Sequence, residues 1–142
     1  MIFTGLIAGL TLGTCTAARW YLDRSSRRES AFWGGRIRLT ALRNGGSAFG
    51  LLRLGRWPLA ALSAAVLAGG LPLYRKRPVS GGLLLGGGLS NLWERLRHGS
   101  VYDYVELPGA PRPAGRYVFN LADFAIMLGT GGLFLGKCRK HR

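Results

Sequence analysis

The sequence predicts a mainly α-helical membrane protein of one domain, with four transmembrane helices, a short interfacial helix and a small unit of strands on the membrane surface. Apolar residues make up 48% of the 142 residues although 18% of the chain is charged, and they are concentrated in four runs. Each run lies near the roughly 17 to 25 residues that cross a bilayer core of about 30 Å. In a soluble helical protein, the alternative, the helices would need polar faces, and these runs show almost none.

The four predicted helices cover residues 2–20, 57–74, 78–97 and 117–136. The apolar runs within them contain no charged residue and no His, except for Asp123 in the last run. The chain has 23 glycines, which weaken soluble helices but suit the close approach of helices in lipid. No Lys or Arg precedes the first run, so the basic region of a cleaved signal peptide is missing. We therefore expect a retained first helix.

A surface unit is predicted between the first and second helices. Residues 34–43 alternate apolar and basic side chains, as a half-exposed strand does, and a turn of one Asn and two Gly follows at 44–46. The strand unit is expected within residues 33–56. Residues 21–32 are polar and charged, and we expect them to form the short helix at the interface.

The formal net charge of +14 invites a nucleic-acid hypothesis. However, the charges lie between the apolar runs rather than along one helix face, so binding to anionic lipid headgroups explains them more simply and no nucleic-acid partner is expected. Residues 75–77 and the tail at 137–142 together hold seven Lys and Arg, whereas the segments on the opposite side, 19–56 and 95–116, hold thirteen. The positive-inside rule alone therefore leaves the orientation undecided.

The two cysteines, Cys15 and Cys138, lie in different segments and lack the spacing of metal ligands. Neither a zinc site nor a disulfide is predicted.

Asp123 is the one acidic residue inside an apolar run. An ionised carboxylate in hydrocarbon is costly and usually marks function, although a structural polar contact between helices is the alternative. Asn120 lies three residues earlier and so shares a helix face with Asp123. Another polar group is expected to face this stripe.

The end of the third predicted helix supplies a candidate partner. Asn91, Glu94 and Arg95 share one helix face there, and Asp103 follows between aromatic and β-branched residues that favour a short extended segment. Two carboxylates placed close together do not ionise independently, so one keeps a proton while the other acts as a base. Such a pair suits the hydrolysis of peptide bonds.

Three blocks of the sequence resemble those of the bacterial lipoprotein signal peptidases, the signal peptidase II family. Residues 44–50, Asn-Gly-Gly-Ser-Ala-Phe-Gly, are similar to the family's Asn-x-Gly-Ala-Ala-Phe block. Residues 87–95 and 99–104 contain Ser-Asn-Leu-Trp-Glu-Arg and Gly-Ser-Val-Tyr-Asp-Tyr, similar to Gly-Asn-x-x-Asp-Arg and Gly-x-Val-x-Asp-Phe. Residues 119–123, Phe-Asn-Leu-Ala-Asp, are similar to Phe-Asn-x-Ala-Asp. The order and spacing match, so the resemblance covers nearly the whole chain.

The resemblance implies an intramembrane aspartyl endopeptidase that removes signal peptides from diacylglyceryl-modified prolipoproteins, with Asp103 and Asp123 as the catalytic pair. It also implies a set of substrate-binding residues: Asn44, Asn91, Arg95 and Asn120. The implied fold has four helices and a small extracytoplasmic β-cradle, lies in the bacterial cytoplasmic (inner) membrane and has both termini in the cytoplasm. Prolipoproteins and membrane lipids are the expected partners, a monomer is expected, and neither a metal nor a cofactor is implied.

Some positions depart from the family pattern. Family members usually carry Asp and, four residues later, Lys at the end of the first helix, where this chain has Cys15 and Arg19, and Glu94 replaces an Asp. The change at Cys15 and Arg19 concerns helix packing or substrate positioning. The change from Asp to Glu94 is chemically mild. The alternatives are a non-catalytic relative that binds lipidated peptides, a small ion or proton transporter that uses Asp123 and Glu94, and an interfacial scaffold held by arginines.

Overall fold

The computed structural model describes residues 1–25, 30–45, 55–112 and 114–138. Helices and a small antiparallel sheet make up this part of the chain. The α-helices are α1 (Ile2–Arg24), α2 (Arg56–Gly69), α3 (Leu71–Lys76), α4 (Pro78–His98) and α5 (Leu121–Cys138), with a 3-10 turn at Ala114–Arg116. The strands are β1 (Ala31–Phe32), β2 (Ile37–Asn44), β3 (Val101–Glu106) and β4 (Val118–Phe119).

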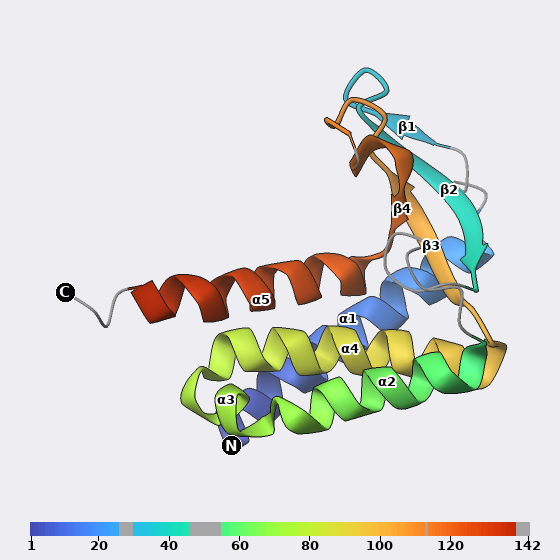
Figure 1. Ribbon diagram of the computed structural model, residues 1–142. Coiled ribbons are helices and arrows are strands. Elements are labelled where there is room, and N and C mark those ends of the chain that lie inside the picture. The colour runs from blue at the N-terminus through green and yellow to red at the C-terminus, as the bar shows by residue number, and fades with distance from the viewer. Residues whose placement is uncertain (26–29, 46–54, 113, 139–142) are drawn as a thin grey trace.

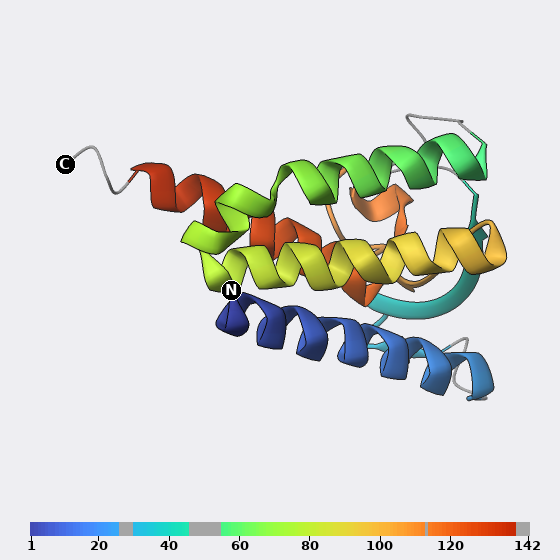
Figure 2. The same cartoon turned by 90° about the horizontal axis from the view of Figure 1, so that it is seen from below.

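Helix α4 is the central helix, because it packs against α1, α2 and α5. The long helices alternate in direction, and Figure 2 shows α4 between α1 and α2. The sheet stands at one end of the helices, which we call the sheet end, and its strands extend past α5 (Figure 1). The start of α1, all of α3 and the end of α5 lie at the other end, the α3 end.

Small residues of α4 let the neighbouring helices approach closely. Four of its buried residues, Gly81, Gly82, Gly86 and Gly87, lie on its packed faces. A Cβ atom on Gly86 would lie 2.6 Å from the carbonyl oxygen of Ala8 in α1, and one on Gly87 would lie 2.7 Å from that of Ala122 in α5. The expectation that glycine serves close helix approach is therefore confirmed for α4.

Replacing Gly86 by Ala should lower the free energy of unfolding by about 1 to 3 kcal/mol, because α1 must move away to admit the methyl group. Gly9 in α1 is the matched control, since a Cβ there would meet nothing within 4 Å. The Gly9→Ala variant should keep or raise the stability, because Ala favours a helix over Gly by up to about 1 kcal/mol. Thermal unfolding of both variants in one detergent measures the difference, and equal midpoints would contradict the close packing.

The second predicted helix, 57–74, is not continuous. The structure breaks it at Gly70, where α2 ends and the short α3 begins with Pro72 in its first turn. Proline cannot donate the backbone hydrogen bond that a continuous helix would need at this position, so the chain starts a new helix instead. The third helix matches its prediction closely and ends at Gly99, which takes the left-handed conformation (φ +73°).

The sheet corrects the prediction of a short interfacial helix over residues 21–32. Residues 21–24 continue α1, and Ala31–Phe32 form a strand that pairs with Ile37–Arg38 of β2, while 26–29 lie outside the described residues. The turn between β1 and β2 uses positive φ angles at residues 33–35, two of which are glycines, and glycine adopts them without strain.

The strand predicted over residues 34–43 is confirmed in its main part by β2. The antiparallel sheet has the order β1-β2-β3-β4, so β3, which follows α4, lies between β2 and β4. The extended segment expected around Asp103 is β3. Residues 46–54 of the predicted cradle lie outside the described residues. The fourth helix begins at Leu121, not at 117 as predicted, since residues 118–119 belong to β4.

By length and composition, α1 is the one helix in the described part of the chain that is both long enough and apolar enough to cross a membrane. A shorter apolar helix covers Leu121–Leu135. Helix α2 has only 14 residues before its break, and the last turns of α4 carry charged side chains. The predicted count of four spanning helices is therefore not established by helix length alone.

Candidate active site

Asp103 and Asp123 lie where the sheet meets the helices. Asp103 belongs to β3 and its side chain is buried, whereas Asp123 lies in the first turn of α5. Buried Asn120 connects them: its Nδ2 donates to Asp103 Oδ1 over 2.7 Å, and its backbone N–H donates to Asp123 Oδ2 over 3.0 Å. One residue therefore holds both carboxylates.

Asn120 also starts α5. Its Oδ1 accepts a hydrogen bond of 3.0 Å from the backbone N–H of Asp123, while the Asp123 carboxylate accepts from the backbone N–H of Asn120. This reciprocal pair is a capping box, in which the N-cap residue and the third helical residue satisfy each other's free N–H groups. The position of the Asp123 carboxylate is therefore tied to the helix start itself.

Two further asparagines fix the remaining carboxylate oxygens. Asn44, the last residue of β2, donates from Nδ2 to Asp103 Oδ2 over 3.1 Å, and Asn91 of α4 donates from Nδ2 to Asp123 Oδ1 over 2.9 Å. In the ladder between β2 and β3, Asn44 pairs with Val101, so Asp103 is its diagonal neighbour on the same face. Each carboxylate thus accepts two hydrogen bonds from different parts of the fold.

Arg95 of α4 lies beside this pair. It is half-buried and lines the same cavity as both aspartates, and its buried Nε has no hydrogen-bond partner among the described residues. Both carboxylates lie within electrostatic range of its guanidinium group. All six predicted site residues are therefore brought together.

Five of the six residues line a cavity of about 450 Å³. The sixth, Asn120, does not line it but donates a hydrogen bond to Asp103, which does. The rest of the wall is mainly apolar and comes from α2, α3, α4, β4 and α5. It includes Leu59, Leu62, Val66, Leu67, Tyr74, Leu84, Phe119, Ile126 and Met127. The sequence did not identify this apolar wall, because residues that face a cavity and residues that face lipid look alike in an apolar helix. The cavity has room for a water molecule beside the carboxylates.

The environment of Asp103 favours its protonated form. Burial raises the pKa of Asp103 to about 6, and the nearby charge of Asp123 adds to this rise. The hydrogen bonds from Asn120 and Asn44 and the charge of Arg95 act in the opposite direction, since they stabilise the carboxylate. Asp103 therefore keeps its proton to higher pH than an exposed carboxyl would.

Two of the residues that depart from the family pattern, Arg19 and Glu94, form an ion pair. Arg19 Nε of α1 lies 3.3 Å from Glu94 Oε1 of α4, and both side chains are largely buried. His98 Nε2 lies 3.6 Å from the same oxygen. This ion pair connects α1 to α4, and Glu94 is not among the described residues that line the cavity. A path for ions through Asp123 and Glu94 therefore finds no support in the cavity.

A family model described as "Signal peptidase (SPase) II" matches residues 7–138, which is nearly the whole chain. The chain belongs to the signal peptidase II family. The resemblance drawn from the three sequence blocks is confirmed.

Curated signal peptidase II relatives are similar in sequence. A lipoprotein signal peptidase of Methylorubrum extorquens is 40% identical over 106 residues, which cover 68% of this chain and 60% of that protein. One of Syntrophomonas wolfei is 39% identical over 122 residues, covering 81% of this chain and 74% of the relative. The alignment thus spans about three fifths of the first relative's length.

The fold has a solved counterpart, a bacterial membrane enzyme whose structure was determined by the in meso method. It superposes with a TM-score of 0.81 over 96% of this chain and 87% of the other, at 20% sequence identity. This signal peptidase II family member therefore shares the fold of that structure.

Proposed function

We propose that this chain is an intramembrane aspartyl endopeptidase that removes signal peptides from diacylglyceryl-modified prolipoproteins. Membership of the signal peptidase II family supports this activity. The observation that carries the mechanism is the pair of Asp103 and Asp123, which come from a strand and a helix, line one cavity and are bridged by Asn120.

In the proposed reaction, ionised Asp123 accepts a proton from a water molecule as the water oxygen attacks the carbonyl carbon of the scissile peptide bond. Protonated Asp103 donates its proton to the carbonyl oxygen, which becomes a hydroxyl group of the tetrahedral intermediate. The C–N bond then breaks as Asp123 gives its proton to the leaving amine, and one hydroxyl of the intermediate returns a proton to Asp103, which forms the carboxylic acid and restores the pair. The raised pKa of Asp103 supports its role as the proton donor.

The remaining polar residues position these groups. Asn120 and Asn91 hold the carboxylates by hydrogen bonds, and Asn44 holds Asp103 from the strand side. Arg95 binds the backbone of the substrate, which is supported by its buried Nε without a partner in the described structure and by its place in the cavity wall. No step needs a metal or a cofactor.

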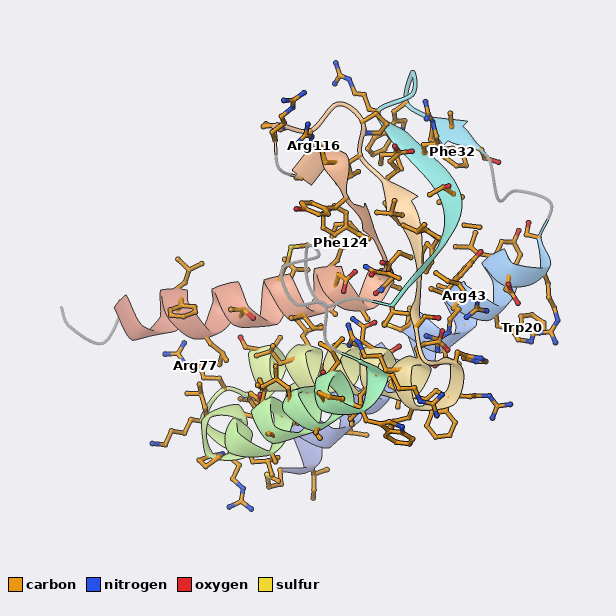
Figure 3. The ribbon with its side chains drawn as sticks, turned by 45° about the vertical axis from the view of Figure 1, so that its right-hand side comes forward. Trp20, Phe32, Arg43, Arg77, Arg116 and Phe124 are labelled. Carbon is orange, nitrogen blue, oxygen red and sulfur yellow. The ribbon has the colours of Figure 1, made fainter. Side chains whose placement is uncertain are left out.

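In this proposal α1, α2 with α3, α4 and α5 all span the cytoplasmic membrane of a bacterium, with both termini in the cytoplasm. Trp20, Trp57 and Trp93 are more than half exposed and lie towards the sheet end of three different helices, as expected for side chains at a membrane interface. Figure 3 shows Trp20 at this end and Arg77 at the other. The basic residues 75–77 then face the cytoplasm.

Exposed apolar side chains along the helices support the same placement, because lipid removes the cost of leaving them uncovered. They occur on all four long helices: Ile2, Phe3, Leu6, Leu10, Leu62, Val66, Val79, Leu89, Met127, Leu128, Phe134 and Leu135.

The apolar wall of the cavity receives the acyl chains of the lipidated cysteine, while the peptide reaches the carboxylates from the sheet end. The wall runs from Leu59 near the start of α2 to Tyr74 in α3, so it follows the length of the helices away from the aspartates. A site that is polar at one end and apolar beyond it matches a substrate with a peptide attached to a lipid. One copy of the chain contains all of these groups, which supports a monomer as the active form.

The proposed activity is tested with the purified chain in liposomes and a prolipoprotein substrate made with and without the diacylglyceryl group. We expect cleavage directly before the lipidated cysteine and little cleavage of the unlipidated form. Binding of the lipidated substrate without cleavage would identify a non-catalytic relative instead. Proton flux without cleavage would identify a transporter.

Replacing Asn44 by Ala should shift the pH dependence of the reaction. The Asn44 amide stabilises the ionised form of Asp103, so its loss raises the pKa of Asp103 further and the residue keeps its proton to higher pH. The descending limb of kcat/KM, expected near the pKa of about 6 in the free enzyme, should therefore move to higher pH.

Thr40→Ala in the same strand is the control, since Thr40 does not line the cavity. Its pH profile should match that of the unaltered enzyme. A limb that stays in place in the Asn44→Ala variant would show that Asp103 does not control it.

A further inference from the structure

Tyr104 is a buried residue of β3 whose hydroxyl reaches the start of α5. Its side chain is only 5% exposed, and its hydroxyl oxygen accepts a hydrogen bond of 3.0 Å from the backbone N–H of Leu121. Leu121 is the first residue of α5, where backbone N–H groups have no partner within the helix. The Asn120 cap satisfies the N–H of Asp123, and Tyr104 satisfies that of Leu121.

This hydrogen bond joins the two chain segments that carry the carboxylates. Tyr104 directly follows Asp103 in β3, and Leu121 precedes Asp123 by two residues in α5. Figure 1 shows the start of α5 directly below β4, beside β3. Tyr104 is not among the described residues that line the cavity, so its hydroxyl acts on the backbone and not on the substrate.

The family block to which residues 99–104 are similar ends in Phe, whereas this chain has Tyr104 there. Cys15 also departs from that pattern, and it lies within electrostatic range of Tyr104 together with Arg19 and Asp123. Cys15 is buried as well, with 3% exposure. The Tyr104 oxygen supplies an acceptor to the N–H of Leu121, which has no partner within the helix.

We propose that Tyr104 is a positioning residue that fixes the first turn of α5 against β3 and so sets the relative position of the Asp103 and Asp123 carboxylates. This inference rests on the proposed peptidase function. It adds a residue that supports the carboxylate pair through the backbone without touching the substrate.

The test compares Tyr104→Phe with Tyr102→Phe, both measured with a lipidated prolipoprotein in liposomes. Tyr102 is the matched control because it is buried in the same strand and its hydroxyl has no hydrogen-bond partner among the described residues. Tyr104→Phe should lower kcat about tenfold with KM nearly unchanged. The variant leaves the backbone N–H of Leu121 without an acceptor, so the first turn of α5 shifts and the two carboxylates lose their relative position. Tyr102→Phe should change neither constant.

The pH profile separates positioning from a general loss of folded enzyme. Asn120 moves with the start of α5, and its hydrogen bond is the strongest influence that lowers the pKa of Asp103. The descending limb of kcat/KM should therefore move to higher pH in Tyr104→Phe and stay in place in Tyr102→Phe. An unchanged kcat in Tyr104→Phe would overturn the inference. So would a reduced kcat whose descending limb of kcat/KM stays in place or moves to lower pH. If the unaltered chain cleaves no substrate, the proposed function fails instead, so the two failures are distinguishable.

Discussion

Replacing Asp103 or Asp123 by Asn is expected to lower kcat/KM for prolipoprotein cleavage by roughly 10⁴-fold or more, as for other residues that act as a catalytic unit. In the proposed reaction Asp123 must accept a proton from water and Asp103 must donate one, and an amide does neither. Each Asn keeps the size of the side chain and can still accept, through its Oδ1, one of the two hydrogen bonds that the carboxylate receives, so the fold should persist. Removing both carboxylates together should cost little more than removing one, since each is useless without the other.

Asp23→Asn is the matched control for this experiment. Asp23 is an exposed residue near the end of α1 and does not line the cavity. It undergoes the same chemical change, and its activity should remain within about twofold of the unaltered enzyme because surface substitutions have small effects. Substantial cleavage by either dyad variant, at equal amounts of folded enzyme, would exclude the paired-aspartate mechanism.

Replacing Asn120 by Ala is expected to have the second largest effect, a loss of roughly 10² to 10³-fold in kcat. Asn120 donates to Asp103 from its side chain and to Asp123 from its backbone, and it caps the helix that carries Asp123. Alanine removes the first contact and the cap. The free energy of unfolding should also fall by about 0.5 to 2 kcal/mol through the lost cap.

Asn120→Ser separates these two roles. Serine is a good N-cap residue, so it should keep the helix start and the stability, but it is too short to replace the amide donor to Asp103. We expect a stability close to that of the unaltered enzyme with activity between the two. Equal activity of the Ser variant and the unaltered enzyme would mean that the 2.7 Å hydrogen bond to Asp103 contributes nothing to catalysis. Rates and unfolding midpoints measured on the same preparations decide this.

Parts of the fold followed directly from local patterns. The alternation of apolar and basic residues gave β2, because one face of a strand lies against the structure and the other does not. The uncharged run predicted α4, whose observed end at His98 lies one residue beyond the predicted one. Apolar content could not locate breaks within a helix, so the break at Gly70 and the late start at Leu121 were missed. The signals were present, as Pro72 for the first and Asn120 with Asp123 as a capping pair for the second.

The site was predictable where its residues carry charge or amide groups in a known pattern, and not where it depends on distant packing. The resemblance to the family supplied the six polar residues, and the structure brings them together. The hydrogen bond from Leu121 to Tyr104 joins residues 17 apart whose contact depends on how β3 meets α5. The pairing of Arg19 with Glu94 likewise depends on the packing of α1 against α4.

The central claim is that Asp103 holds a proton beside ionised Asp123. Its most direct test is an infrared difference titration of the purified enzyme, which follows the band of protonated carboxyl groups. Exposed carboxylates are mostly ionised by about pH 5, so a carboxyl group that titrates near 6 stands apart from them. We expect one such band, which is absent in the Asp103→Asn variant and titrates at lower pH in Asp123→Asn, because the neighbouring charge is lost. A band that Asp103→Asn leaves unchanged, or no protonated carboxyl group above about pH 5, would contradict the paired-aspartate site.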